Sequence, residues 1–419
     1  MQTQRRKIKL FGGSRHSTKT QKRQPSTARI AVKTMSIALA VLTAGYLLFA
    51  FSNIGPIAKL RSIYIETAMS TMRHQWLATA FLPDSVIREA MEKVNDARAD
   101  QIGVETNWGS EENDPYHTVP SPTDPSASAE EKAFYELFWE IDPDTMTSYL
   151  NSHPEALQDG WENLSINEAG LNDDGTTIRT IQDEQVLAID VPNQVLLVRV
   201  KGMSYQGVLA VAKDPSRLKL QATRYEGSVG QFAGDLCEDA GGVLAITASG
   251  FIDEGGVGMG GLLAGYAMSD GKGRGTHYGY GYKRLELRDD DRMYIVDAQN
   301  SVNSRTTDAA EFWPALIIDG KRMDTSGWSE LNPRVSIGQS DRYEVLMLVI
   351  EGRLATSIGT TAAEAAEILA RHNCMQAMNM DGGTSAIMYY DGEYVTRCSN
   401  TALPSGRQLP NAWVYGVKD

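Results

Sequence analysis

An uncharged stretch near the N-terminus separates two parts of the chain that carry opposite charge. Residues 35–58 contain no Asp, Glu, Lys or Arg, and residues 35–51 are mostly aliphatic. Ten Lys or Arg and no acidic residue lie within residues 1–58, which leaves 30 of the 40 basic side chains beside all 53 acidic ones, a net charge of −23. A helix of about 20 apolar residues spans a bilayer, and basic residues gather on its cytoplasmic side. The pattern predicts a single-pass membrane protein with a cytoplasmic basic tail at 1–33, a transmembrane anchor at 34–58 and an acidic, extracellular remainder.

A cleaved signal peptide is the alternative interpretation of this stretch. Its charged region would have to extend over the first 33 residues, and no clear small-x-small cleavage site precedes Lys59. We therefore expect the anchor to be retained. The basic tail is typical of segments that face anionic lipid, and the acidic remainder argues against a nucleic-acid partner.

Three segments of different character follow the anchor. Apolar residues at three- and four-residue spacing predict a membrane-proximal helical stalk at 59–102, interrupted at Pro83. Residues 103–130 are rich in Pro, Ser and acidic side chains, which predicts an extended linker. Residues 131–163 contain a short amphipathic stretch, and we expect it to pack as a cap on the domain that follows.

Residues 164–419 alternate between short apolar runs and turn residues, which is typical of strands. One clear helix is expected from Thr361 to about Asn373, opened by a capping box of Thr361 and Glu364. Asp391 and Gly392 predict a tight hairpin turn. The fold class is therefore α+β, with a β-rich C-terminal domain and few helices. The predicted strands are 185–191, 194–202, 207–213, 217–225, 241–251, 284–288, 293–298, 315–321, 333–339, 343–354 and 376–381.

The motif NMDGGTS ends an apolar strand and is the most informative part of the chain. Its carboxylate is Asp381, which is followed by two glycines, Gly382 and Gly383, and two hydroxyls, Thr384 and Ser385. Backbone N–H groups at such a turn can cradle an anion such as phosphate. The carboxylate can serve as an acid, a base or a cation ligand. The alternative is a tight turn in which Asp381 only caps free amides.

Five blocks of sequence, in order, resemble the phosphodiester glycosidase family. The resemblance covers roughly residues 164–419 and is strongest from residue 333 onward. It implies a hydrolase that frees a sugar, often N-acetylglucosamine, from a phosphate-linked acceptor. The blocks are ITASGF at 246–251, PRVSIGQ at 333–339, VIEGRLATSIGTTAAEAAEIL at 349–369, NMDGGTS at 379–385 and RQLPNA at 407–412.

The resemblance and the chemistry of a sugar phosphodiester together imply roles for residues of these blocks. A planar guanidinium can bind the phosphodiester anion through two hydrogen bonds, which makes Arg334 and Arg407 the candidates. Carboxylates commonly assist glycosidic C–O cleavage, so Asp381 is the first catalytic candidate and Asp253 the second. We expect the Arg334 guanidinium and the Asp381 carboxylate to face one pocket. The alternative is that either arginine makes only a surface ion pair.

Three further positions complete the predicted site. Asn379 and Asn411 are candidates for holding hydroxyl or N-acetyl groups of the sugar, or they only satisfy backbone groups at strand ends. Thr247 stands where the family usually has Asn, and a hydroxyl lacks the separate donor and acceptor of the amide. This departure leaves open whether the chain retains activity. No cofactor is certain, and a Ca²⁺ or Mg²⁺ ion beside Asp381 is left open because no ligand set can be read.

Other kinds of site fit the sequence poorly. The three cysteines, Cys237, Cys374 and Cys398, have neither the number of a disulfide framework nor zinc-ligand spacing. Residues 256–261 fit G-x-G-x-x-G, but no amphipathic helix follows, as a dinucleotide site requires. No G-x-S-x-G motif of a serine hydrolase is present.

The sequence thus predicts a membrane-anchored, outward-facing hydrolase of glycosyl phosphodiesters, acting on cell-envelope glycopolymers. Two other functions are alternatives. One is a non-catalytic cell-surface carbohydrate-binding or scaffold module with the same fold, which the departure at Thr247 favours. The other is an assembly protein in which the helical stalk acts.

Overall fold

The structure is a computed structural model of the chain, and it divides into two compact units, Met1–Ile57 and Ala58–Asp419. Much of the predicted basic tail, much of the predicted linker and the first glycine of the G-x-G-x-x-G motif lie outside the described residues. The residues that the structure describes are 27–69, 75–108, 127–171, 175–253, 258–277, 279 and 281–417.

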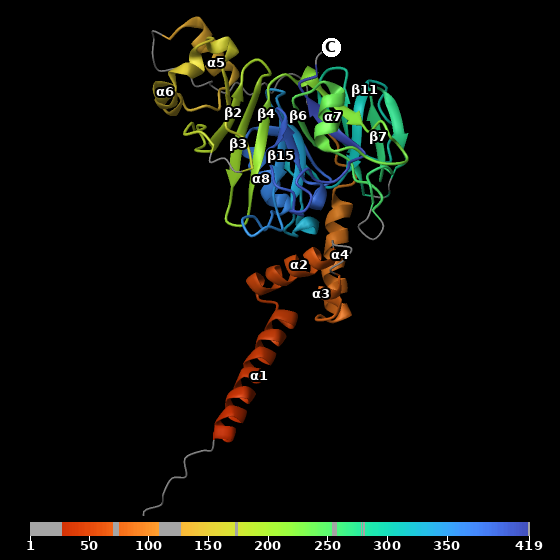
Figure 1. The fold of residues 1–419 in the computed structure, drawn as a ribbon. Coiled ribbons are helices and arrows are strands. Elements are labelled where there is room, and N and C mark those ends of the chain that lie inside the picture. Colours follow the sequence, from red (N-terminus) through yellow and green to blue (C-terminus); the bar gives the residue numbers. More distant parts are fainter. Residues whose placement is uncertain are drawn as a thin grey trace, which may run out of the picture. The chain divides into compact units, whose positions relative to one another are not determined.

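The first unit contains the predicted membrane helix, α1 (Thr27–Phe51) (Figure 1). Its segment Ala31–Phe51 is long and apolar enough to cross a membrane, with a mean hydropathy of 1.9. The helix ends before the predicted boundary at residue 58, because residues 52–54 are not helical. A signal sequence near an N-terminus shares this length and composition, so the helix fits both interpretations.

The second unit is built on three antiparallel sheets within the described residues. The nine-stranded sheet has the order β1 (Ser165–Asn167), β2 (Gln185–Asp190), β3 (Val195–Lys201), β4 (Gln206–Ala212), β15 (Val345–Ile350), β14 (Arg334–Ser340), β16 (Cys374–Met380), β12 (Ala315–Ile318) and β13 (Lys321–Arg322). One five-stranded sheet has the order β10 (Met293–Asp297), β9 (Lys283–Arg288), β11 (Thr306–Phe312), β7 (Tyr266–Ser269) and β8 (Lys272–Gly275). The other has the order β18 (Glu393–Tyr394), β17 (Met388–Tyr390), β6 (Leu244–Thr247), β19 (Asn411–Tyr415) and β5 (Leu218–Ala222).

The main core lies between the inner faces of these sheets. Side chains alternate along each strand, so Val335 of β14 and Met380 of β16 enter the core that all three sheets share. The next positions face the other side of the nine-stranded sheet, where Arg334 lies opposite Ile350 in register. Ile350 belongs to a second core that helix α8 (Ala362–Arg371) covers. The two faces at this end of the sheet therefore have different surroundings.

Helices pack on the outside of the sheets (Figure 1). Helix α7 packs on β17, β6 and β19 through a third apolar cluster, and α8 covers one face of the nine-stranded sheet. The helices after α1 are α2 (Gly55–Met69), α3 (Trp76–Thr79), α4 (Asp84–Asp100), α5 (Ala129–Leu137), α6 (Pro143–Ser152), α7 (Ala233–Ala240) and α8 (Ala362–Arg371). Short 3-10 helices lie at Pro154–Leu157, Trp161–Asn163, Pro215–Arg217, Ser326–Trp328 and Gly383–Ser385.

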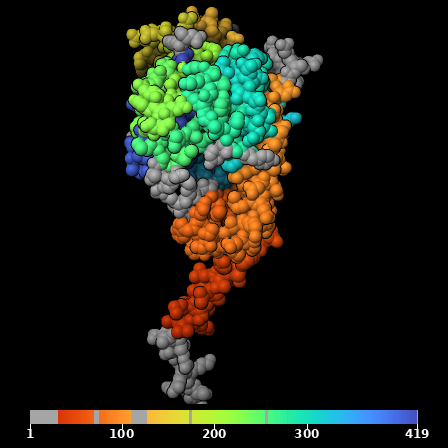
Figure 2. All heavy atoms as spheres, turned by 90° about the vertical axis from the view of Figure 1, so that its right-hand side faces the viewer, coloured from red at the N-terminus to blue at the C-terminus, as the bar shows by residue number. Residues whose placement is uncertain are grey.

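The helical segment predicted as a membrane-proximal stalk at 59–102 belongs to the second unit. Val94 of α4 is buried against the backbone of Gly327, and Gln101 is buried with hydrogen bonds to both the N–H and the C=O of Ala315. Figure 2 shows the segment 75–108, in orange, against the β-rich part of the unit. The apolar spacing of the helix is correct, and this face packs on the domain at the 3-10 helix Ser326–Trp328.

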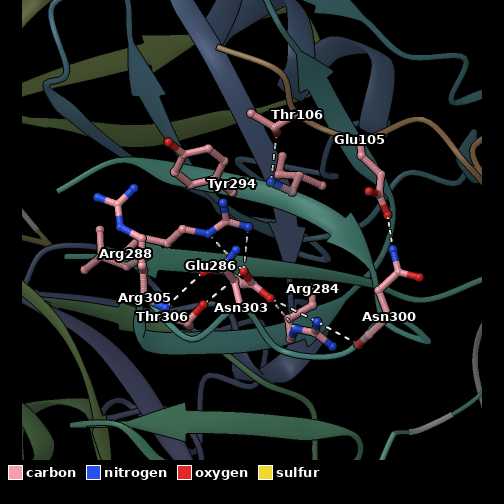
Figure 3. A network of polar contacts seen from close by, with 12 residues as sticks. Glu105, Thr106, Arg284, Glu286, Arg288, Tyr294, Asn300, Asn303, Arg305 and Thr306 are labelled. Carbon is pink, nitrogen blue, oxygen red and sulfur yellow. Dashed lines mark hydrogen bonds and ion pairs between the residues drawn. The ribbon is translucent and has the colours of Figure 1, made fainter. Parts of the chain in front are cut away.

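The first residues of the predicted linker at 103–130 are also fixed to the domain. The backbone N–H of Thr106 donates to the carbonyl of Ile295, and the Thr106 hydroxyl accepts from the Ile295 N–H. Glu105 accepts hydrogen bonds from the Asn300 side chain and the Asp297 N–H. Figure 3 shows this segment beside a buried polar network on the neighbouring sheet. Residues 104–108 therefore pack on the domain, and residues 109–126 lie outside the described part.

Local predictions in the second unit are confirmed. The Thr361 hydroxyl accepts from the Glu364 N–H at 3.1 Å, and the Glu364 carboxylate accepts from the Thr361 N–H at 2.9 Å, which is the expected capping box. Asp391 and Gly392 have φ of +47° and +89°, as the predicted hairpin turn requires. The three cysteines are buried free thiols.

Candidate active site

Three chain segments that are far apart in sequence meet at one end of the sheets. They are the residues after β6, the turn after β16 and the residues before β19. The Asp381 N–H donates to the carbonyl of Ala248 at 3.0 Å, which joins the first two segments. The Ser249 N–H donates to the side-chain oxygen of Asn411 at 2.8 Å, which joins the first and the third. Backbone contacts thus place the predicted site residues of three blocks together.

Asp381 is half-buried in this junction and has a perturbed acidity. Burial raises the pKa of Asp381 to about 6, and the Asp253 carboxylate contributes in the same direction. A hydrogen bond with Ser385, the charge of Arg407 and the Gly382 N–H act in the opposite direction and favour the carboxylate. A carboxyl group with a pKa close to neutral can exchange a proton during a reaction. Such shifts are characteristic of functional sites.

Asp253 and Arg407 form an ion pair with two hydrogen bonds beside Asp381. The Arg407 guanidinium donates to both carboxylate oxygens of Asp253, at 2.5 and 3.0 Å. It also donates to the Gly258 carbonyl at 2.6 Å and lies over the Phe251 ring at 4.5 Å from its centre. Both side chains are mostly buried, with 16% and 23% of their surfaces exposed. Asp253, the second catalytic candidate, and Arg407, the second candidate for binding phosphate, are therefore bound to each other.

Arg334 does not reach this junction, which corrects the prediction that its guanidinium and Asp381 face one pocket. The side chain is buried on the face that α8 covers. Its guanidinium donates to the carbonyls of Thr360, Trp328 and Glu330 at 2.9, 3.2 and 3.0 Å and to the Glu330 carboxylate at 3.1 Å. These acceptors satisfy the buried guanidinium, so Arg334 has a structural role.

The two predicted asparagines differ in how their amides are used. Asn411 is buried, accepts from the Ser249 N–H and donates to the Ser249 hydroxyl at 3.1 Å, so its amide fixes a loop. Asn379 is also buried and donates to the carbonyls of Trp313 and Met380 at 3.1 and 3.0 Å. Its side-chain oxygen has no hydrogen-bond partner among the described residues. Asn379 thus keeps a free acceptor two residues before Asp381.

Thr247, at the position where the family usually has Asn, serves the fold. Its side chain is fully buried, and its hydroxyl donates to the Ser385 carbonyl at 2.5 Å. This contact ties the end of β6 to the turn after β16. The hydroxyl is therefore not presented to a ligand.

The two glycines of the motif allow a close approach of main chains. A Cβ on Gly382 would lie 2.5 Å from the carbonyl oxygen of Pro333, and the Gly383 N–H donates to that oxygen at 2.9 Å. Gly383 has a φ of +60°, which side chains other than glycine rarely adopt. The hydroxyl of Thr384 accepts from the Ser399 hydroxyl at 3.3 Å. The turn is therefore fixed from both sides.

Arg353 is a residue of this site that the sequence did not single out. A Cβ on Gly383 would lie 3.4 Å from Nη1 of Arg353, so the guanidinium lies against the turn. Burial lowers the pKa of the Arg353 guanidinium from its ordinary value, and the charge of the Asp381 carboxylate offsets part of this effect. Arg353 stands in the block VIEGRL, which was matched to the family as a whole. The signal was present, but no role had been given to this arginine.

Metal ligands are few at the junction. Among the described residues, no group of three or more His, Cys, Asp or Glu side chains comes together as a metal site. Asp253 and Asp381 are the carboxylates of the junction, and Ca²⁺ takes about six to eight oxygen ligands.

The junction lies within a region that is similar to a known family. The family model described as phosphodiester glycosidase matches residues 240–415. Residues 240–415 are thus similar to the phosphodiester glycosidase family. The resemblance found in the sequence is confirmed over these residues, which include every predicted site residue from Thr247 to Asn411.

Individual relatives of the glycosidase domain are distant. The prophage-derived protein YomE of Bacillus subtilis is 28% identical over 171 residues, which are 38% of this chain and 26% of that protein. The chain thus spans about a quarter of the length of this curated relative.

Two solved structures are also similar to the chain. The catalytic domain of zebrafish N-acetylglucosamine-1-phosphodiester alpha-N-acetylglucosaminidase is 14% identical, with a TM-score of 0.44 over 53% of this chain and 81% of that one. A hypothetical protein of Synechocystis is 11% identical, with a TM-score of 0.40 over 57% of this chain and 65% of that one. Neither similarity assigns a role to a residue here.

Proposed function

We propose that the glycosidase domain hydrolyses glycosyl phosphodiesters and that Asp381 is the proton-accepting group of the reaction. The observation that carries the proposal is the half-buried carboxyl group at the glycine turn, joined to the residues after β6 by the hydrogen bond from the Asp381 N–H to Ala248. Burial raises the pKa of this group to about 6. A base whose pKa lies near the working pH is largely ionised and still accepts a proton readily. The family match supports a phosphodiester substrate.

The reaction follows from the chemistry of the leaving group. The oxygen of a water molecule attacks the anomeric carbon, and its proton passes to the Asp381 carboxylate. The bond between the anomeric carbon and the phosphate oxygen breaks, and the electron pair leaves with the phosphate. The products are a free sugar and a phosphomonoester. A phosphodiester leaves more readily than a sugar alkoxide, so the step depends less on an acid than ordinary glycoside hydrolysis does.

Asp253 and Arg407 act on Asp381 as a pair. The Arg407 charge favours the Asp381 carboxylate and the Asp253 charge opposes it. Because the two side chains hold each other through two hydrogen bonds, their effects on Asp381 partly cancel. Burial is the larger cause, so the pKa remains raised. In this proposal burial sets the acidity of the base, and the pair adjusts it.

The activity is tested on the full-length chain in detergent with an N-acetylglucosamine 1-phosphodiester, by measuring released reducing sugar. We expect Asp381→Asn to lower kcat by about 100-fold or more. Asp183→Asn is the matched control, because Asp183 is an exposed acid whose side chain is 93% accessible. Absence of turnover by the wild-type chain, or full activity of Asp381→Asn, would contradict the proposal.

We also propose that the domain faces the outside of the cell and acts on phosphate-linked glycopolymers of the envelope. The apolar helix Ala31–Phe51 and the basic residues before it support this topology. Protease added to intact cells is expected to remove the glycosidase domain and to leave the N-terminal tail. Protection of the domain in intact cells would exclude this location.

Non-catalytic glycan binding is the second candidate function. The observation that favours it is the buried Thr247 hydroxyl, which donates to the Ser385 carbonyl and offers no group to a sugar. This function predicts binding of a glycosyl phosphodiester without release of sugar. The same reaction mixture, examined by equilibrium dialysis for bound ligand, distinguishes the two functions.

A further inference from the structure

We propose that Arg353 holds the phosphate group of the substrate against the turn formed by Gly382, Gly383, Thr384 and Ser385. This inference rests on the proposed function, since it assigns the anionic part of the substrate to a defined position beside Asp381. The anion is a phosphodiester, and the guanidinium binds its two free oxygens.

The three arginines near the junction have different partners. Arg334 is buried, and its guanidinium donates to three carbonyls and one carboxylate. Arg407 donates to both oxygens of Asp253 and to a carbonyl. Arg353 is exposed, and its Nη2 donates to the side-chain oxygen of Asn332 at 2.9 Å. That amide is neutral, and the Asp381 carboxylate acts on Arg353 through its charge, so of the three arginines Arg353 is the one best placed to receive an external anion.

The position of Arg353 is fixed by its backbone. Its N–H donates to the Ile358 carbonyl at 2.9 Å, and the next residue, Leu354, forms an isolated bridge with Ser357. The residue itself has a φ of +58°. This small hairpin follows β15 directly, so the guanidinium starts from a rigid strand. A positioned guanidinium loses less entropy on binding than a mobile one.

The glycine turn provides the facing surface. The guanidinium lies over Gly383, where a Cβ would be 3.4 Å from Nη1 and 3.6 Å from Nη2. The Thr384 hydroxyl belongs to the same turn and is half-exposed. Two donor types, a guanidinium and a hydroxyl, thus lie at the turn where a phosphate would be bound. The absence of a side chain at Gly383 leaves the guanidinium face open.

The charge of Arg353 also fits the chemistry at Asp381. The two groups are close enough for the Asp381 carboxylate to stabilise the guanidinium charge. A phosphodiester bound here brings a negative charge beside a carboxylate, and Arg353 compensates for that charge. A neutral glycoside needs no such compensation. The arrangement therefore selects anionic substrates over neutral ones.

The kinetic test compares Arg353→Gln with the wild type on the full-length chain in detergent. The substrate is the N-acetylglucosamine 1-phosphodiester, and the control variant is Arg371→Gln, an exposed arginine paired with Glu184. Loss of a charged hydrogen-bond donor corresponds to about 10- to 100-fold in binding. We expect that increase in KM for Arg353→Gln, with a smaller change in kcat, and partial recovery in Arg353→Lys. A KM within twofold of the wild type would overturn the inference.

A binding measurement separates this inference from the proposed function. Inorganic phosphate is titrated into each variant and followed by ³¹P line broadening, which needs no turnover. We expect the phosphate affinity of Arg353→Gln to fall about tenfold relative to the wild type and to Arg371→Gln. Absence of turnover together with this loss of binding contradicts the proposed reaction and supports the anion site. Equal phosphate affinity in all three proteins, or none in any, overturns the anion site.

Discussion

The guanidinium of Arg407 binds both carboxylate oxygens of Asp253, at 2.5 and 3.0 Å, and the pair lies beside Asp381. The two members act on Asp381 in opposite directions. Arg407 lowers the pKa of Asp381, and Asp253 raises it. Removal of one member should therefore shift the acidity of Asp381 in a direction that identifies the member removed.

Substitutions in this pair are expected to move the acid limb of the pH–rate profile. Arg407→Gln removes the charge that favours the Asp381 carboxylate, so the pKa rises above about 6 and activity falls at a higher pH. Asp253→Asn removes the opposing carboxylate, so the pKa falls and activity persists to a lower pH. The measurement is kcat/KM against pH, which reports groups of the free enzyme.

Arg407→Lys is the control for this prediction. It retains the positive charge but loses the planar two-bond geometry, so it should move the acid limb less than Arg407→Gln does. Acid limbs that shift in the same direction for Arg407→Gln and Asp253→Asn would show that the pair does not act on the base by charge.

Asp381→Asn is expected to stabilise the fold at neutral pH while it removes activity. The folded-state pKa of about 6 lies above the ordinary value of 3.8, so the folded state binds a proton more tightly than the unfolded state. Ionised Asp381 therefore costs stability above pH 6, and the cost disappears as the pH falls below 3.8. We expect a gain of about 1–3 kcal/mol at pH 7.

Urea unfolding of the full chain, followed by tryptophan fluorescence, measures this gain. The difference between Asp381→Asn and the wild type should be largest at pH 7 and should shrink on acidification through pH 6. A difference that does not depend on pH would mean that the amide stabilises the turn for reasons other than charge.

A buried ion triad attaches the cap segment to the nine-stranded sheet. The Lys213 ammonium lies 2.6 Å from Glu140 in the cap segment and 2.8 Å from Glu344, and all three side chains are at most 7% exposed. Lys213→Met leaves two buried carboxylates without a cation, which should cost about 3–5 kcal/mol. The measurement is urea unfolding, with limited proteolysis of residues 129–163 as a second readout.

A triple variant tests the cause of this loss. Lys213→Met combined with Glu140→Gln and Glu344→Gln removes every charge of the triad and should recover much of the stability. If the triple variant is as unstable as Lys213→Met alone, the loss comes from packing of the lysine chain rather than from unpaired charge.

The strands of the second unit could be predicted from the sequence where apolar residues dominate the segment. Strands such as β4 and β15 contain continuous apolar runs because both of their faces are buried. The strand β11 was missed because it carries buried Asp308 and Glu311 instead of aliphatic residues. Helix α7 is only eight residues long, too short for a helical period to be distinguished.

Local motifs indicated the candidate residues of the site, but not which of these residues lie close together in the fold. The backbone contacts that bring Ala248, Asp381 and Asn411 together are long-range and leave no pattern in the sequence. Arg334 was predicted at the site because the chemistry needs a guanidinium. In the structure its guanidinium donates to the buried carbonyls of Thr360 and Glu330, which lie on loops away from the site. Arg353 was passed over because a single arginine after a strand is common on surfaces.

Gly382→Ala is expected to impair both the stability and the activity of the domain. The φ of Gly382 is −115°, so the backbone itself tolerates a side chain. The added Cβ would lie 2.5 Å from the backbone oxygen of Pro333, closer than real contacts allow, and the turn would have to move. Displacement of a catalytic group by about 1 Å costs about 100-fold in rate, and overpacking costs about 1–3 kcal/mol.

The control for this substitution is Gly55→Ala, since a Cβ on Gly55 meets no atom within 4 Å. The measurements are kcat on the N-acetylglucosamine 1-phosphodiester and the urea midpoint of the full chain. Gly55→Ala should leave both unchanged, whereas Gly382→Ala should lower both, because the displaced turn carries the neighbouring Asp381 with it. Wild-type activity in Gly382→Ala would show that the close approach to Pro333 does not position the carboxylate.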